Sequence, residues 1–255
     1  LVDTLLSRPG YASHMYNWMG DFLRIVDKAN NNTYLRPWGD WIKQNLRDNT
    51  PWDKMVHQML TAEGKSWENP AVGFVLRDPG MPLDNLNNAV RVFMGTRIGC
   101  AQCHDHPFDR WTMDDYYSFL SFFTGMKRKA GVEPREQRIY YDTAALPARN
   151  LVDQRPTPAR TLGAVQPVDH DGDPRRKLAA WLTSADNEMF SRNLANRIWA
   201  QLTGRGVVEP VDDVRVSNPP TNEPLLKALS EHLVASGFNL RSLAREICNS
   251  RVYQL

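Results

Sequence analysis

Residues 84–112 read DNLNNAVRVFMGTRIGCAQCHDHPFDRWT, and this stretch decides how the predicted helices follow one another along the chain. Asp84 can cap a helix in which apolar residues recur at intervals of three and four as far as Ile98. That pattern predicts a helix that runs directly into the pair of cysteines that follows. Pro107 then prevents a helix from continuing, so the thiols are expected at a helix end, before a short irregular turn.

Helical spacing continues on both sides of this stretch. Apolar residues at intervals of three and four, often between capping residues, predict helices over 13–27, 38–46, 51–60, 113–124, 173–182, 187–203, 222–236 and 239–253. Thr112 and Asp115 resemble a capping box for the helix that Gly125 closes. Gly204 is a suitable left-handed C-cap. These signals predict a mainly α fold.

The periodicity disappears between residues 126 and 172, where prolines and arginines are scattered. Such a segment indicates a linker or an extended wrapping arm. Only Gln137–Tyr141 suggests a strand. We therefore expect a helical part at 1–126, an extended Pro-rich arm at 127–172 and a second helical part at 173–255, with at most a minor β element.

Composition limits the classes of function. The 255 residues are 42% hydrophobic, which is enough to bury a substantial core, and the net charge of +2 gives no sign of a nucleic-acid or other charged partner. Three cysteines are too few for a disulfide framework. No apolar run reaches the ~20 residues of a membrane-spanning helix. Since Leu1 already lies in a helical pattern, the chain is expected to be part of a longer product.

The segment Cys100-Ala101-Gln102-Cys103-His104 has the form of an attachment site for a c-type haem. Two cysteines bind the vinyl groups through thioether bonds, and the adjoining histidine becomes the proximal iron ligand. The spacing of one helical turn places both sulfurs at one porphyrin edge. One covalent haem c, with His104 on the iron, is therefore the first hypothesis.

Zinc is the main alternative, because Cys100, Cys103 and either His104 or His106 would provide thiolate and imidazole ligands. A second Cys/His pair at zinc-finger spacing is missing from the sequence. A reducible dithiol is the remaining possibility.

Aromatic and basic residues near the motif suit a haem pocket. A haem needs apolar walls around the porphyrin and hydrogen-bond donors for its propionates. The candidates for the walls are Phe93, Phe108, Trp111, Tyr116 and Phe119, and those for the propionates are Arg97 and Arg110. The aromatic residues fit an ordinary core equally well. His106 is too near His104 to reach the opposite face of the same ring, so we expect it to be a hydrogen-bonding neighbour.

The sequence alone does not identify the sixth ligand of the iron. The candidates on the N-terminal helices are His14, His57, Met15, Met19, Met55 and Met59. Met55 and Met59 also fit a buried stripe. The acidic residues Asp105, Asp109, Asp114 and Asp115 are better explained as solvated caps than as a calcium site, and His170-Asp171-Gly172-Asp173 as a turn and helix cap.

The motif and its flanks resemble a known family. Phe93–Thr112, together with Asp114-Asp115-Tyr116-Tyr117 and Phe122-Phe123, is similar to the signature of the planctomycete cytochrome-like DUF1549 (PSCyt2) domain. Asp173–Arg176, Leu182–Ser184, Asn196-Arg197 and Gly204–Gly206 resemble the DUF1553 (PSD1) domain, which commonly follows it. That second family usually extends beyond a pair like Tyr253-Gln254, so its C-terminal part is expected to be missing here.

The resemblance implies export to the periplasm or cell surface and a possible haem, without naming a reaction. Our first hypothesis is extracytoplasmic electron transfer to a redox partner protein or another haem subunit, with the C-terminal helices as a docking module in a larger assembly. The second is a haem-dependent oxidoreductase that acts on a small molecule or carbohydrate. The third is a structural interaction module stabilised by zinc or a disulfide.

Overall fold

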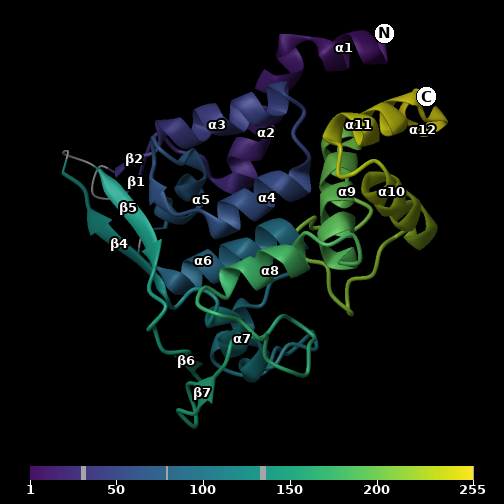
Figure 1. The fold of residues 1–255 in the computed structure, drawn as a ribbon. Coiled ribbons are helices and arrows are strands. Elements are labelled where there is room, and N and C mark those ends of the chain that lie inside the picture. Colours follow the sequence, from purple (N-terminus) through teal and green to yellow (C-terminus); the bar gives the residue numbers. More distant parts are fainter. Residues whose placement is uncertain (30–32, 79, 133–135, 255) are drawn as a thin grey trace.

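The computed structural model describes residues 1–29, 33–78, 80–132 and 136–254, and it is mainly α with minor β structure, as predicted (Figure 1). The helices are α1 (Val2–Ser7), α2 (Pro9–Leu23), α3 (Arg36–Arg47), α4 (Trp52–Thr61), α5 (Gly73–Leu76), α6 (Pro82–Ala89), α7 (Met113–Leu120), α8 (Arg175–Leu182), α9 (Glu188–Thr203), α10 (Glu223–Ala235), α11 (Leu240–Asn249) and α12 (Arg251–Gln254). Short 3₁₀ turns cover Pro70–Val72 and Gly99–Gln102, and a π-helical turn covers Val90–Met94.

The strands are short and antiparallel. They are β1 (Lys28–Ala29), β2 (Thr33–Tyr34), β3 (Gly64–Lys65), β4 (Met126–Ala130), β5 (Gln137–Tyr141), β6 (Ala148–Arg149) and β7 (Pro156–Thr157), arranged as the pairs β1-β2 and β6-β7 and the three-stranded sheet β3-β5-β4. The strand predicted at 137–141 is confirmed as β5. Strand β4 was not predicted, because four of its five residues are exposed and its sequence shows no apolar alternation.

Two short strands within the segment 127–172, β6 and β7, are joined to helix α7. Ser121 at the end of α7 accepts a hydrogen bond from the Ala148 amide at 2.8 Å and donates one to the Thr157 carbonyl at 2.6 Å. One buried hydroxyl therefore joins β6 and β7 to α7.

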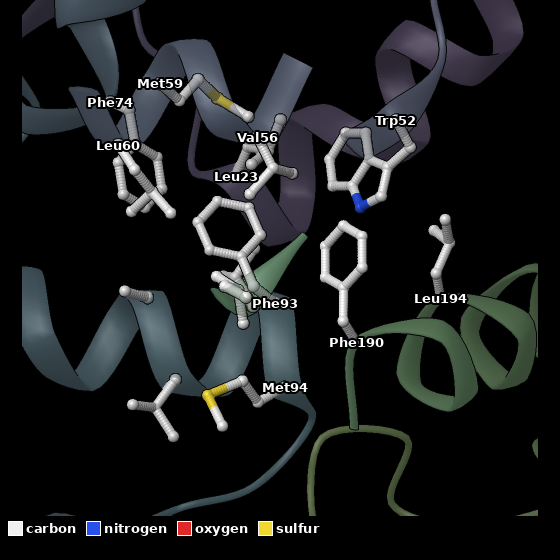
Figure 2. Packing of buried hydrophobic residues seen from close by; sticks show 14 of the residues in the cluster. Leu23, Trp52, Val56, Met59, Leu60, Phe74, Phe93, Met94, Phe190 and Leu194 are labelled. Atoms are coloured by element: carbon white, nitrogen blue, oxygen red, sulfur yellow. The ribbon is translucent and has the colours of Figure 1, made fainter. Parts of the chain in front are cut away.

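Aromatic and aliphatic side chains from both helical parts form one core cluster (Figure 2). Trp52 of α4 lies between Phe22 and Phe93, with ring centroids 6.3 and 6.2 Å away, and Phe93 also packs against Phe74. Phe190 of α9 enters the same cluster. The predicted amphipathic stripes are therefore buried against one another, as helix periodicity requires.

Several predicted caps are confirmed. Thr112 and Asp115 form the reciprocal capping box of α7. The predicted helix starts at Asn187, Asn222 and Asn239 are also observed, and each asparagine accepts a backbone N–H at the start of α9, α10 and α11. Gly204 ends α9 in the left-handed region, at a φ of 82°.

Four predicted helix ends were wrong. The helix over 13–27 ends at Leu23, where Arg24 takes up the left-handed conformation at a φ of 55°. The helix over 84–98 begins at Pro82, so Asp84 lies in its first turn and does not cap it. It changes to the π turn at Val90 and stops at Gly95, whose φ is 68°, so it does not run into the cysteines. The helix over 113–124 ends at Leu120 and continues as turns. The helix over 239–253 breaks at Ser250, where ψ is 151°, before the short α12. Apolar spacing persisted through all four breaks, since turn residues can also face the core.

Candidate haem-binding site

The cysteine motif lies on the surface, on the 3₁₀ turn Gly99–Gln102 between the π turn and α7. Ala101 is completely buried and anchors the turn, while Cys100 and Cys103 are exposed free thiols. The hydroxyl of Tyr117 donates to the Gln102 carbonyl at 2.8 Å. The turn is therefore fixed to α7 on its inner side and presents both sulfurs outward.

The backbone orients the imidazole of His104. Its Nδ1 lies 2.7 Å from the Asp105 carbonyl oxygen, and because a carbonyl can only accept, Nδ1 must carry the proton. Nε2 is then left with a lone pair for a metal. The Asp105 carboxylate accepts the Met113 amide at 2.9 Å, at the start of α7. Asp105 therefore connects the imidazole to a helix terminus.

His106 lies inside a tight turn beside the motif. Its Nδ1 accepts the Phe108 amide at 3.2 Å, and its own amide donates to the Trp111 carbonyl at 2.8 Å. The imidazole is half-buried. It thus stabilises the 106–111 turn that follows the predicted proximal ligand.

The predicted wall residues divide into two groups. Phe93, Trp111, Tyr116 and Phe119 are buried in the core, whereas Phe108 is 64% exposed. Burial also raises the pKa of the Tyr116 hydroxyl to about 12. Phe108 is therefore the predicted wall residue with a free aromatic surface next to the motif.

The two predicted propionate partners have different neighbours. The guanidinium of Arg97 pairs with Asp212 at 2.6 Å, and this hydrogen bond raises its pKa above the ordinary value. Arg110 is exposed and lies over the Trp111 ring, 4.6 Å from the ring centroid. About half of the Arg97 side chain is still exposed, so both cations can reach an anionic group.

Asp212, which was not predicted from the sequence, accepts from two arginines in the stretch before the motif. Arg91 pairs with one of its oxygens at 2.7 Å and Arg97 with the other at 2.6 Å. The neighbouring Val214 amide donates to the Gly95 carbonyl at 2.7 Å. The residues next to Asp212 in the sequence do not indicate these ion pairs, because its two arginine partners lie more than one hundred positions earlier in the chain.

Helix α9 also holds the stretch before the motif in place, through hydrogen bonds to Arg91 and Val92. The side-chain amide of Asn193 donates to the Val92 carbonyl at 2.8 Å. The buried guanidinium of Arg197 donates to the Asn193 side-chain oxygen at 3.0 Å and to the Arg91 carbonyl at 2.9 Å. Burial lowers the pKa of Arg197 to about 10, partly offset by Asp212. These contacts satisfy the backbone groups that the π turn leaves open.

The loop after α9 reaches Phe108, in the turn that follows the motif. The Ser217 hydroxyl donates to the Phe108 carbonyl at 3.0 Å, and the Arg215 guanidinium lies 5.7 Å from the Phe108 ring centroid. Val216 between them is 76% exposed. The second helical part therefore contributes a basic side chain beside Phe108.

The candidate sixth ligands are not gathered at the motif. Met15, Met19, Met55 and Met59 are packed in the core, while His57 is exposed on α4 and His14 on α2, where its Nε2 lies 3.3 Å from the Gln201 amide. Within the described ranges, no three His, Cys, Asp or Glu side chains are grouped to hold a metal ion. The acidic residues near the motif act as caps or ion-pair partners.

The tract at 170–173 also has the predicted structural role. His170 Nδ1 lies 3.1 Å from the Gly172 carbonyl, and Asp173 accepts the Arg175 amide at 2.9 Å. It forms a turn and then caps the first turn of α8.

Residues 1–128 match the family model described as Protein of unknown function (DUF1549). The chain belongs to the DUF1549 family. Residues 174–255 match the model described as Protein of unknown function (DUF1553), so the two matches occur in the expected order. No curated protein matches the chain, and no solved structure does. Across the part of the chain that the structure describes, no helix combines the length and apolar character of a membrane span.

The two family segments meet at the stretch that leads to the cysteines. Asn193, Arg197 and Asp212, from the DUF1553 segment, bind residues 91–97 of the DUF1549 segment. The resemblance singled out Arg197 without assigning it a role. Its contacts give it a structural one, because it positions the stretch that carries the motif.

Proposed function

We propose that this DUF1549 chain is a c-type haem protein that acts in extracytoplasmic electron transfer. The observation that carries the proposal is the combination of two exposed thiols three residues apart with a histidine whose Nδ1 is fixed by a backbone carbonyl. Cys100 and Cys103 would hold the haem through thioether bonds, and His104 would ligate the iron through Nε2. A bound haem supplies a one-electron redox couple.

The residues around the motif fit this role. The Asp105 carbonyl keeps the proton on Nδ1 of His104 and so keeps Nε2 available as a ligand. Phe108 offers an exposed aromatic face, and Arg97 and Arg110 offer donors for propionates.

Exposure of the motif favours an electron carrier over an enzyme. A haem attached to thiols at the surface leaves an edge within reach of a redox partner protein or another haem subunit, and Val216 and Phe108 add apolar contact area. Thioether attachment of haem takes place outside the cytoplasm, which agrees with the exported location that the family resemblance implies. The haem-dependent oxidoreductase and the zinc or disulfide module are the competing hypotheses that the experiment separates.

The test is the reduced pyridine-haemochrome spectrum of the chain, produced in cells that export it and attach haem c. Haem staining on a denaturing gel reports whether the attachment is covalent. The variant Cys100→Ala/Cys103→Ala removes both thioethers. Cys248→Ala is the matched control, because it removes the one remaining thiol, which lies partly buried on α11.

A c-type spectrum that survives Cys248→Ala and is lost in the double variant supports the proposal. A colourless protein that binds one equivalent of zinc through Cys100 and Cys103 contradicts it. A haem protein that turns over a small molecule or carbohydrate at an open iron position would support the oxidoreductase instead.

A further inference from the structure

The three-stranded sheet β3-β5-β4 aligns cations across all of its strands. The register places Lys65 of β3 opposite Arg138 of β5, and Arg138 opposite Lys129 of β4. Paired residues in an antiparallel sheet project to the same face, so the three side chains form one row. Like charges directly opposite one another are unfavourable, and Arg138 has one on each side.

Two further residues share this face of the hairpin. Lys127 lies two positions before Lys129 on β4 and is opposite Tyr140 on β5. The Lys129 ammonium lies 5.9 Å from the centroid of the Tyr140 ring. Lys127, Lys129, Arg138 and Tyr140 are all exposed, and together they are called the basic hairpin face.

The ion pairs of the described residues divide the cations of this sheet into two groups. Lys65 pairs with the buried Glu136 at 2.8 Å and with Glu68 at 3.6 Å, so its charge is compensated. Across the described ranges, Lys127, Lys129 and Arg138 form no ion pair with a carboxylate. The near-zero net charge of the whole chain hides this local concentration of cations.

Protection of a sheet edge does not account for the arrangement. Lysines on an exposed edge strand prevent pairing with another chain, and β4 is such an edge. Arg138, however, is on the central strand β5, where edge protection needs no charge. The hairpin lies at one side of the molecule, beyond the helices (Figure 1).

We propose that the basic hairpin face binds an acidic polysaccharide, a sugar chain with regularly spaced carboxylate or sulfate groups. Side chains two apart on a strand are about 6.6 Å apart, and cross-strand neighbours about 5 Å, a spacing suited to the charges along such a polymer. The exposed ring of Tyr140 adds an apolar face for stacking on a sugar ring. Stacking on a ring face favours a polysaccharide over a duplex nucleic acid or an anionic lipid surface, neither of which presents a free ring face.

The experiment measures binding of the full chain to immobilised polymers at two salt concentrations. Polygalacturonate presents carboxylates, heparin presents sulfates, and neutral dextran presents neither. Double-stranded DNA and phosphatidylserine vesicles test the other classes of anionic partner. We expect binding to one or both acidic polysaccharides, no binding to dextran, and an affinity that falls as salt rises.

The main variant is Lys127→Gln/Lys129→Gln/Arg138→Gln. Its matched control is Arg176→Gln/Lys177→Gln/Lys227→Gln, which removes the same charge from exposed positions on α8 and α10. The hairpin variant should bind the acidic polymers at least about tenfold more weakly, and the control within about twofold of the wild type. Tyr140→Ala should weaken polysaccharide binding without changing its salt dependence.

Stability separates lost binding from lost folding. The hairpin variant removes the opposed like charges, so its melting temperature should be equal to or above that of the wild type. Equal losses of binding in the hairpin and control variants would overturn the proposal. So would DNA or vesicle binding as tight as polysaccharide binding, with Tyr140→Ala having no effect. The test is independent of haem, since it reads only polymer binding.

Discussion

Asp105 connects the predicted haem ligand to the fold. Its carbonyl fixes His104 Nδ1, and its carboxylate accepts the Met113 amide at the first turn of α7. Asp105→Ala removes that second contact and should lower the free energy of unfolding by about 1 kcal/mol. Asp105→Asn keeps an acceptor and should lose less. Urea denaturation followed by circular dichroism measures both, and an Asp105→Ala variant as stable as the wild type would show that the contact contributes nothing.

Arg197 is the buried cation that positions the stretch before the motif. Its replacement by methionine leaves the Asn193 side chain and the Arg91 carbonyl without their donor. We expect a loss of about 3 kcal/mol in the free energy of unfolding. Arg197→Lys keeps the positive charge but lacks the planar guanidinium that donates both hydrogen bonds, so it should lower the free energy of unfolding by a smaller amount. Arg205→Met is the control, because Arg205 is exposed just beyond α9; equal losses at the two positions would refute this role.

At the scale of single residues, the sequence predicts contacts between residues that are close to one another in the chain. The capping box Thr112–Asp115 and the N-cap asparagines were predictable because each bond spans three residues. Asp212 was not, because its arginine partners are brought to it only by the folded chain. Burial of Tyr116 and Phe119 in the core also depends on packing that residue type alone does not specify.

At the scale of elements, Gly95 ends the π turn and starts the path to the cysteines. Its φ is 68°, and a Cβ there would lie 2.5 Å from Asn193 Oδ1. Gly95→Ala should therefore lower the free energy of unfolding by at least about 2 kcal/mol.

Gly163→Ala is the matched control, since its φ is 81° but its Cβ would meet nothing within 4 Å. It should cost about 1 kcal/mol, from backbone strain alone. Urea denaturation of both variants gives the comparison. Equal losses would mean that the contact with α9 does not constrain the stretch before the motif.

Helix existence was more predictable than helix ends. Apolar spacing identified the helices because burial of one face imposes the period of the helix. The same spacing continued through Val90–Met94 and Ser250, where the backbone leaves the α conformation. Strand β4 was missed for the opposite reason, since it buries too little to show alternation.

At the scale of the molecule, the two family segments share one core. The Trp52 amide of α4 donates to the Phe238 carbonyl at 3.1 Å, and Arg241 of α11 donates to the Leu46 carbonyl at 3.0 Å. Arg175 of α8, fully buried, pairs with Glu63 at 2.9 Å. We expect a single calorimetric unfolding transition for the chain.

The fragment 1–172 tests this directly. Without α8 to α11 it exposes the part of the core that they cover, so it should melt without cooperativity or at a much lower temperature. Calorimetry of the fragment beside the full chain gives the answer. Two separate transitions in the full chain, or a fragment that melts like the full chain, would contradict the shared core.

The sequence predicted the fold class and the two helical parts but not how they meet. Helical periodicity shows that a face is buried without showing which partner buries it. The contact of α9 with residues 91–97 therefore needed the structure. The motif itself was evident from the sequence because its residues are consecutive.

The most direct test of the haem proposal is mass spectrometry of the tryptic peptide Ile98–Arg110, made from chain exported by cells that attach haem c. Trypsin cuts after Arg97 and Arg110, so this one peptide carries both thiols and His104. The proposal predicts that the peptide gains the mass of one haem, attached through Cys100 and Cys103. Recovery of the peptide with both cysteines as free thiols or as a disulfide would contradict it.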